Sequence, residues 1–140
     1  MESPEALRSD LLDENHFIDL KRELEPGKKA NTDLAQDIAA FAIHGGLVLI
    51  GVTEGPPVEL NSVPLQGLPE RIEQIARMKV DEGLAVTATP IPARDDPTVG
   101  YVAIDVPTSP RAPHMVDRRY YARGNKTNIV LSDQRGAAVS

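Results

Sequence analysis

Apolar residues recur at helical spacing between residues 33 and 44. They fall at positions i, i+4 and i+7 with alanines beside them, which predicts a helix with one narrow buried face: Leu34, Ile38 and Phe41. Asp33 is the predicted start of this helix, because Gln36 follows three residues later as in a capping box. Gly45-Gly46 is the predicted end, because glycine readily adopts the positive φ of a helix C-terminus.

An apolar run at 47–52 follows directly and has no polar position on either face. This run predicts a central strand that is buried on both sides. Further strands are predicted at 17–23, 84–91, 99–106 and 119–122. A second helix is expected from Leu68, where Pro69 suits the first turn, to near Gly83, whereas 28–31 is expected to be a turn.

The order of these elements predicts an α+β fold, in which two main helices pack on one face of a mixed β-sheet. The other face of the sheet is left open for a partner. The whole chain, 1–140, is expected to form a single domain. Within it, 1–13 is predicted to be a short amphipathic helix, and 132–140 a ragged or truncated tail.

Composition excludes several classes of protein. The chain contains no cysteine, which rules out thiolate zinc sites and disulfide scaffolds and fits an intracellular protein. No stretch reaches the ~20 apolar residues that a membrane span needs, and the first residues do not resemble a signal peptide. We therefore expect a cytoplasmic protein without a membrane partner.

The distribution of charge is uneven. The net charge is -6, which argues against a surface built mainly for phosphate backbones. The segment 107–126 nevertheless carries five basic residues against one aspartate, and two adjacent tyrosines interleave with them. Aromatic faces beside positive charge can stack bases and hold phosphates, although a solvated charge run is the alternative. The candidate nucleic-acid-binding residues are Arg111, Arg118, Arg119, Tyr121, Arg123 and Lys126.

Three acids and one lysine are the candidates for catalytic chemistry: Glu14, Asp19, Glu54 and Lys21. Asp19 and Lys21 share a face if their segment is extended, and Glu54 follows the apolar strand. Carboxylate oxygens are the ligands that Mg²⁺ and Mn²⁺ prefer, and such an ion can activate water against a phosphodiester. The alternative is a set of surface ion pairs at strand ends.

These motifs together resemble the Schlafen AlbA-type domain, a family associated with DNA binding. The likeness runs from residue 14 to residue 128 and comprises Glu…Asp-x-Lys, a helix ending AFA-x-x-GG, a strand ending GV-x-E, and the late YYARG. The family pattern usually has Asn before the glycine pair and Glu in the place of Asp19. In Schlafen-type nucleases, the resemblance implies that acids at the positions of Glu14, Asp19 and Glu54 hold the metal.

The first functional hypothesis is a nucleic-acid-binding domain, for DNA or RNA, in a bacterial-type regulator or defence-related protein. One alternative is an endoribonuclease that depends on Mg²⁺ or Mn²⁺ and uses the three carboxylates. Another is a protein-interaction or oligomerisation module, which the acidic net charge suits. Because Schlafen-type cores resemble two such lobes around a cleft, and this chain carries one set of motifs, a homodimer is expected.

Overall fold

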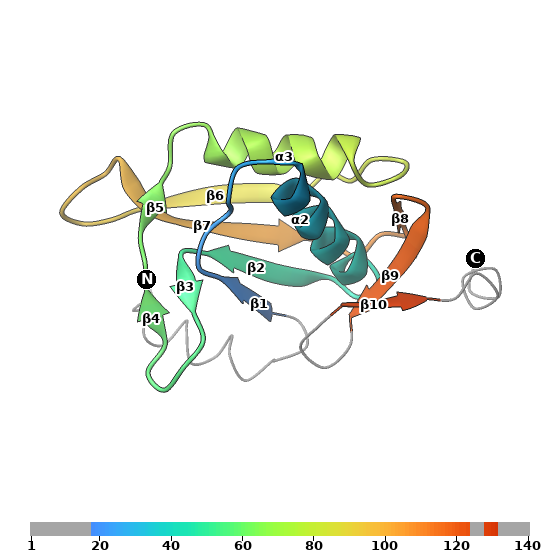
Figure 1. Ribbon diagram of the computed structural model, residues 1–140, viewed down its shortest axis with the longest axis horizontal. Helices are drawn as coiled ribbons and strands as arrows, with labels where there is room; N and C mark the ends of the chain where they lie inside the picture. Colours follow the sequence, from blue (N-terminus) through green and yellow to red (C-terminus); the bar gives the residue numbers. More distant parts are fainter. Residues whose placement is uncertain (1–17, 124–127, 132–140) are drawn as a thin grey trace.

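The computed structural model of the protein describes residues 18–123 and 128–131. Figure 1 shows two helices lying over a central sheet, with a smaller sheet at one end of the first helix. The elements in chain order are β1 (Ile18–Lys21), α2 (Lys28–Phe41), β2 (Gly46–Ile50), β3 (Val52–Thr53), β4 (Glu59–Leu60), β5 (Val63–Pro64), α3 (Leu68–Met78), β6 (Thr87–Pro92), β7 (Val99–Val106), β8 (Met115–Val116), β9 (Arg119–Arg123) and β10 (Asn128–Leu131). The predicted α+β class is confirmed.

The central sheet is mixed. Strand β2 lies between β1, to which it runs parallel, and β7, to which it runs antiparallel. Strand β6 pairs antiparallel along the other side of β7, and β5 pairs with the first residues of β7. The central position predicted for the apolar run after the glycine pair is therefore confirmed.

Both helices pack on the same face of this sheet, as predicted. The strands contribute side chains that are fully buried, since alternate residues of β2 and β7 point to the helices: Val48, Ile50, Val102 and Ile104. The helices contribute the apolar stripes that the periodicity indicated, including Leu34, Ile38, Phe41 and Ile72. All of these side chains belong to one hydrophobic core.

The first helix begins earlier than the sequence indicated. It starts at Lys28, so the prediction of a turn at 28–31 is wrong. Gly27 is the N-cap, with φ 108°, and no side chain caps the helix. Asp33 instead lies one turn inside, where its carboxylate pairs with the Lys29 ammonium at 3.1 Å. Lysine and alanine form helix readily after Pro26-Gly27, so the helix needs no capping box.

The two glycines after α2 have different structural roles. Gly45 has φ 85°, a conformation that side chains rarely adopt, and its N–H donates to the Phe41 carbonyl at 2.6 Å, which ends the helix. Gly46 faces the ring of Phe41, and a Cβ atom there would lie 2.1 Å from the ring atom Cδ1. The second glycine thus allows the strand to pass directly against a core side chain.

A guanidinium group ties α3 to α2 and to the segment between β1 and α2. Arg71 donates to the side-chain oxygen of Asn31 from Nε at 3.1 Å and from Nη2 at 2.6 Å. It also donates to the carbonyls of Leu24 at 3.3 Å and Glu25 at 2.5 Å. These four hydrogen bonds fix the course of the chain as it leaves β1.

The smaller sheet consists of β8, β9 and β10, all antiparallel, and it packs against α2. The sequence indicated only β9 among these three strands. Strands β8 and β9 form a tight hairpin, in which Val116 pairs with Arg119. The two residues between them, Asp117 and Arg118, have φ values of 50° and 66°. Positive φ at both central positions is the geometry of a type I′ hairpin turn.

Candidate functional site

An ionic cluster joins β1, α2 and the smaller sheet, and it consists of Asp19, Lys21, Asp37, Arg123 and Asn128. The Lys21 ammonium lies 2.6 Å from Asp37 Oδ2 and 3.3 Å from Asp19 Oδ2. The other oxygen of Asp19 accepts from the Arg123 guanidinium at 3.3 Å. Two acids and two bases thus alternate in one chain of contacts, and the charges of the cluster sum to zero.

The remaining contacts hold β9 and β10 onto α2. The Asn128 amide donates to Asp37 Oδ1, and Arg123 donates to the Asn128 side-chain oxygen at 3.3 Å. The Arg123 guanidinium also lies over the ring of Phe41, 4.9 Å from its centre. Only 8% of the Arg123 side chain is exposed. Arg123 therefore connects the ionic cluster to the hydrophobic core.

The environment shifts the pKa of two members of the cluster. Burial lowers the pKa of the Lys21 ammonium, but Asp37 and Asp19 more than offset this effect, so the pKa lies above its usual value. Burial raises the pKa of Asp37, and the nearby ammonium offsets only part of that rise. Lys21 is therefore held in its charged form, whereas Asp37 takes up a proton more readily than an ordinary aspartate.

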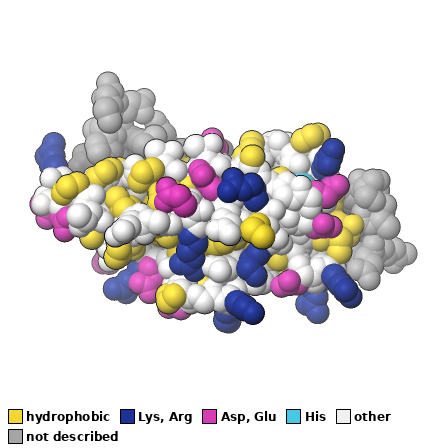
Figure 2. All heavy atoms as spheres, turned by 90° about the horizontal axis from the view of Figure 1, so that it is seen from above, with side chains coloured by type: hydrophobic (Ala, Val, Ile, Leu, Met, Phe, Trp, Pro, Cys, Tyr) yellow, Lys and Arg dark blue, Asp and Glu magenta, His cyan; other side chains and the backbone are white. Residues whose placement is uncertain are grey.

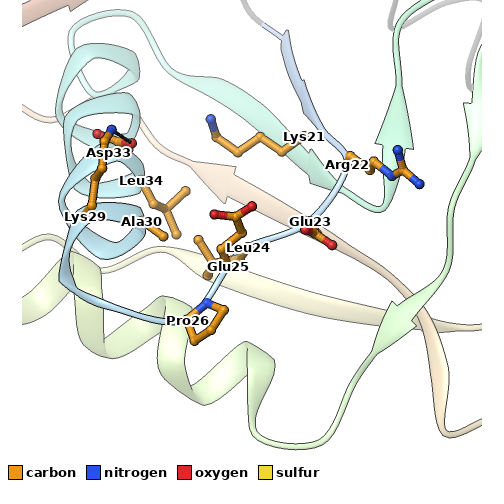
Figure 3. A pocket seen from close by; sticks show the side chains of 10 residues that line it. All are labelled: Lys21, Arg22, Glu23, Leu24, Glu25, Pro26, Lys29, Ala30, Asp33 and Leu34. Atoms are coloured by element: carbon orange, nitrogen blue, oxygen red, sulfur yellow. Dashed lines mark hydrogen bonds and ion pairs between the residues drawn. The ribbon is translucent and has the colours of Figure 1, made fainter.

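Lys21 also lines a cleft of about 710 Å³ between the end of β1 and α2. Figure 3 shows its ammonium reaching across towards α2, while the neighbouring Arg22 points the opposite way. The helix side of the cleft carries the ion pair of Lys29 with Asp33. A second cavity, of about 290 Å³, lies on the α3 side, and residues 23–26 line both.

The three carboxylates predicted to hold a metal are only partly placed. Glu14 lies outside the described residues, and Glu54 is exposed just after β3. Asp19 already pairs with two cations of the protein, Lys21 and Arg123, and their positive charge opposes the binding of a divalent ion beside it. Within residues 18–123 and 128–131, no three His, Cys, Asp or Glu side chains group as a metal site. The site of Glu14, Asp19 and Glu54 stays a prediction.

The structure contradicts two placements in the predicted nucleic-acid-binding segment. Tyr121 is only 7% exposed and belongs to the hydrophobic core, so its ring cannot stack on bases. Arg123 is buried in the ionic cluster. Both point inward because the inner face of β9 packs on α2, which the sequence of one strand does not reveal. Lys126 lies outside the described residues.

The exposed members of that segment are Arg111, Arg118 and Arg119. Arg111 lies 3.5 Å from a Glu82 carboxylate oxygen, across an exposed pair that contributes little stability. Arg118 and Arg119 occupy the tip of the β8–β9 hairpin, where neither forms an ion pair with another described residue. On the face that Figure 2 shows, basic side chains are interspersed with acidic ones.

Sequence reasoning missed Asp37 and Asn128. Asp37 falls between Leu34 and Phe41 on the buried stripe of α2, so an acid at an apolar position was a readable signal. Asn128 gave no such signal, because its partner lies 91 residues away in the sequence.

The buried histidine is a structural residue. His114 is 3% exposed, and its Nε2 lies 2.7 Å from the Ser109 hydroxyl. Its Nδ1 lies 3.1 Å from the Asp81 carbonyl. Both ring nitrogens are therefore occupied in tying together two loops.

Comparisons with known proteins agree with this architecture. A family model described as Schlafen, AlbA_2 matches residues 14–132. The crystal structure of the DIP2311 protein from Corynebacterium diphtheriae is similar over 91% of this chain and 29% of that chain, with a TM-score of 0.58. At 16% sequence identity, this likeness shows the fold alone. The search of curated proteins gave no match. Among the described helices, none is long and apolar enough to cross a membrane.

Proposed function

Because the chain belongs to the Schlafen AlbA_2 family, we propose that it is a nucleic-acid-binding domain whose β8–β9 hairpin tip contacts phosphates. The observation that carries this proposal is the residue at the second position of the turn. A type I′ turn strongly favours glycine there, because φ must be positive. This chain has Arg118, with φ 66°, followed by the exposed Arg119.

The arginine at this position is costly for the fold. A side chain in the left-handed region costs roughly 1–2 kcal/mol, and within the described chain no ion pair compensates Arg118. Arginine is well suited to phosphate, since its guanidinium can donate two parallel hydrogen bonds. Arg118 thus places a positive charge at a position whose backbone conformation glycine would adopt at a lower cost, which supports a role of this side chain in binding.

The other end of the same strand explains how the tip is held. Strand β9 runs from Arg119 at the tip to Arg123, which is fixed by Asp19, Asn128 and the ring of Phe41. The ionic cluster therefore anchors the hairpin on the body of the protein. A contact surface that is already ordered loses less conformational entropy when it binds.

The decisive test is the salt dependence of binding to single-stranded RNA and DNA oligonucleotides, measured by fluorescence anisotropy. In the double variant Arg118→Gly, Arg119→Ala, two phosphate contacts are lost. The slope of log affinity against log salt should then decrease in magnitude by about 1.4, at ~0.7 per contact. The matched control is Arg77→Ala, Arg94→Ala, which removes the same charge from exposed positions elsewhere and should leave that slope unchanged.

Arg118→Gly alone separates binding from stability. Glycine relieves the backbone at φ 66°, so the free energy of unfolding should stay constant or rise by up to about 1 kcal/mol while affinity falls. A wild-type protein that binds neither nucleic acid at low salt would refute the proposal. An equal decrease of the slope in the matched control would show that the hairpin tip is not the site of phosphate contact.

A further inference from the structure

Strands β6 and β10 each lie at an edge of a sheet, and they differ in how their free edges are protected. A strand at the edge of a sheet presents unpaired N–H and C=O groups that can pair with another strand. In the central sheet, β6 pairs only with β7 among the described strands. In the smaller sheet, β10 pairs only with β9 among the same strands.

The free edge of β6 cannot donate hydrogen bonds to another strand. The N–H of Ala88 donates to the Glu73 side chain of α3 at 3.3 Å, so it points away from β7. The direction of N–H alternates along a strand, which gives residues 90 and 92 the same outward direction. Both are prolines and have no N–H. Each outward donor position of β6 is therefore either occupied or absent.

Among the residues that the structure describes, strand β10 has none of these protections. Its residues are Asn128, Ile129, Val130 and Leu131, without proline and without charge. Two of the four direct their N–H and C=O groups away from β9 because of the same alternation. Ile129 is 44% exposed and Val130 is 53% exposed, and both are β-branched residues that favour strand pairing.

We propose that β10 pairs antiparallel with β10 of a second copy of the chain, joining two smaller sheets into one of six strands. An antiparallel pair of identical strands is two-fold symmetric, so every outward donor meets an acceptor on the partner and the assembly closes as a dimer. Each copy carries a net charge of -6, and an uncharged strand lets two acidic chains meet without placing like charges at the contact. The proposal is independent of nucleic-acid binding.

The contact is small. A four-residue strand pair buries less than the roughly 800 Å² per partner of a standard interface, so the dimer should form weakly and depend on concentration. Sedimentation velocity over a concentration series that reaches the millimolar range should show a monomer that converts to a dimer. A monomer throughout the series would overturn the proposal.

A matched pair of variants locates the interface. Val130→Lys places a charge on the proposed edge, whereas Ile91→Lys places the same charge on β6, at a residue that is 45% exposed. Val130→Lys should abolish the dimer and Ile91→Lys should leave it intact, with circular dichroism confirming that both are folded. If Ile91→Lys alone abolished the dimer, or if both variants affected it equally, the contact would lie on another surface and the proposal would be overturned.

Hydrogen exchange on the unmodified protein gives an answer that does not depend on a variant folding. The outward amide hydrogens of β10 should exchange more slowly at high protein concentration than at low concentration, because they become hydrogen-bonded in the dimer. The amide hydrogens of β6 should exchange at the same rate in both. Exchange in β10 that is independent of concentration would contradict strand pairing even if a dimer forms.

Discussion

Replacing Gly46 with alanine tests how tightly β2 passes the end of α2. The added Cβ would lie 2.1, 2.7 and 2.8 Å from three carbon atoms of the Phe41 ring. Ordinary contact begins at 3.4 Å, so the ring must move by about 1.3 Å, the difference between 3.4 and 2.1 Å. Phe41 is only 1% exposed, and the Arg123 guanidinium lies over its ring. The ring therefore has no open space beside it.

The magnitude follows from these contacts. Overpacking a core costs about 1–3 kcal/mol, and disturbing the stacked guanidinium adds about 0.5–1 kcal/mol. Alanine regains about 0.5–1 kcal/mol over glycine in a strand, because it loses less backbone entropy on folding. Gly46→Ala should lower the free energy of unfolding by about 2 kcal/mol, measured by urea denaturation followed by circular dichroism.

A second substitution shows whether the ring is the cause. Phe41→Ala removes the three ring atoms that clash, so Gly46→Ala should cost at least about 1 kcal/mol less in that background than in the wild type. The control is Gly67→Ala, at a residue with φ 73° and no atom within 4 Å of the new Cβ, which reports backbone strain alone. A Gly46→Ala protein within 0.5 kcal/mol of wild type, or additive effects in the double variant, would refute the reasoning.

Two further predictions concern polar contacts. Arg71→Ala should lower the free energy of unfolding by about 2–3 kcal/mol, because it removes four hydrogen bonds, three of them part-buried. Arg71→Lys should recover only part of this loss in urea denaturation, and full recovery would show that charge alone matters. Burial raises the pKa of Asp37 in the folded protein, so protonation of its carboxylate favours the folded state. The resulting gain in the free energy of unfolding is complete below the pKa of the unfolded chain, near 3.8, and is lost as the pH rises through the folded pKa. Relative to Asp37→Asn, the wild type should therefore gain stability as the pH falls from neutral towards 4, and a constant difference between the two unfolding free energies across that range would contradict it.

The sequence was sufficient for the class of fold because its strongest signals are local. The stripe of Leu34, Ile38 and Phe41 predicted α2, and the apolar run after the glycines predicted β2. The pairing of Asp19 with Lys21 also follows from local geometry, since residues two apart on a strand share a face.

The features that were missed depend on contacts between distant segments. Nothing in β9 alone tells which of its two tyrosines faces α2, so Tyr121 was placed on the wrong side. The hairpin before it gave no turn signal, because Asp117-Arg118 lacks the glycine by which such turns are recognised. Asn128 joins the ionic cluster through a contact that only the tertiary structure creates.

Residues 23–26 line both cavities. Arg71 of α3 donates two hydrogen bonds to this segment, at the carbonyls of Leu24 and Glu25. Its two other hydrogen bonds go to Asn31 of α2, so the segment is held beside that helix. Any displacement of these residues would therefore change the shape of both cavities at once. The hydrogen bonds of Arg71 thus stabilise the shape of two cavities and not of one.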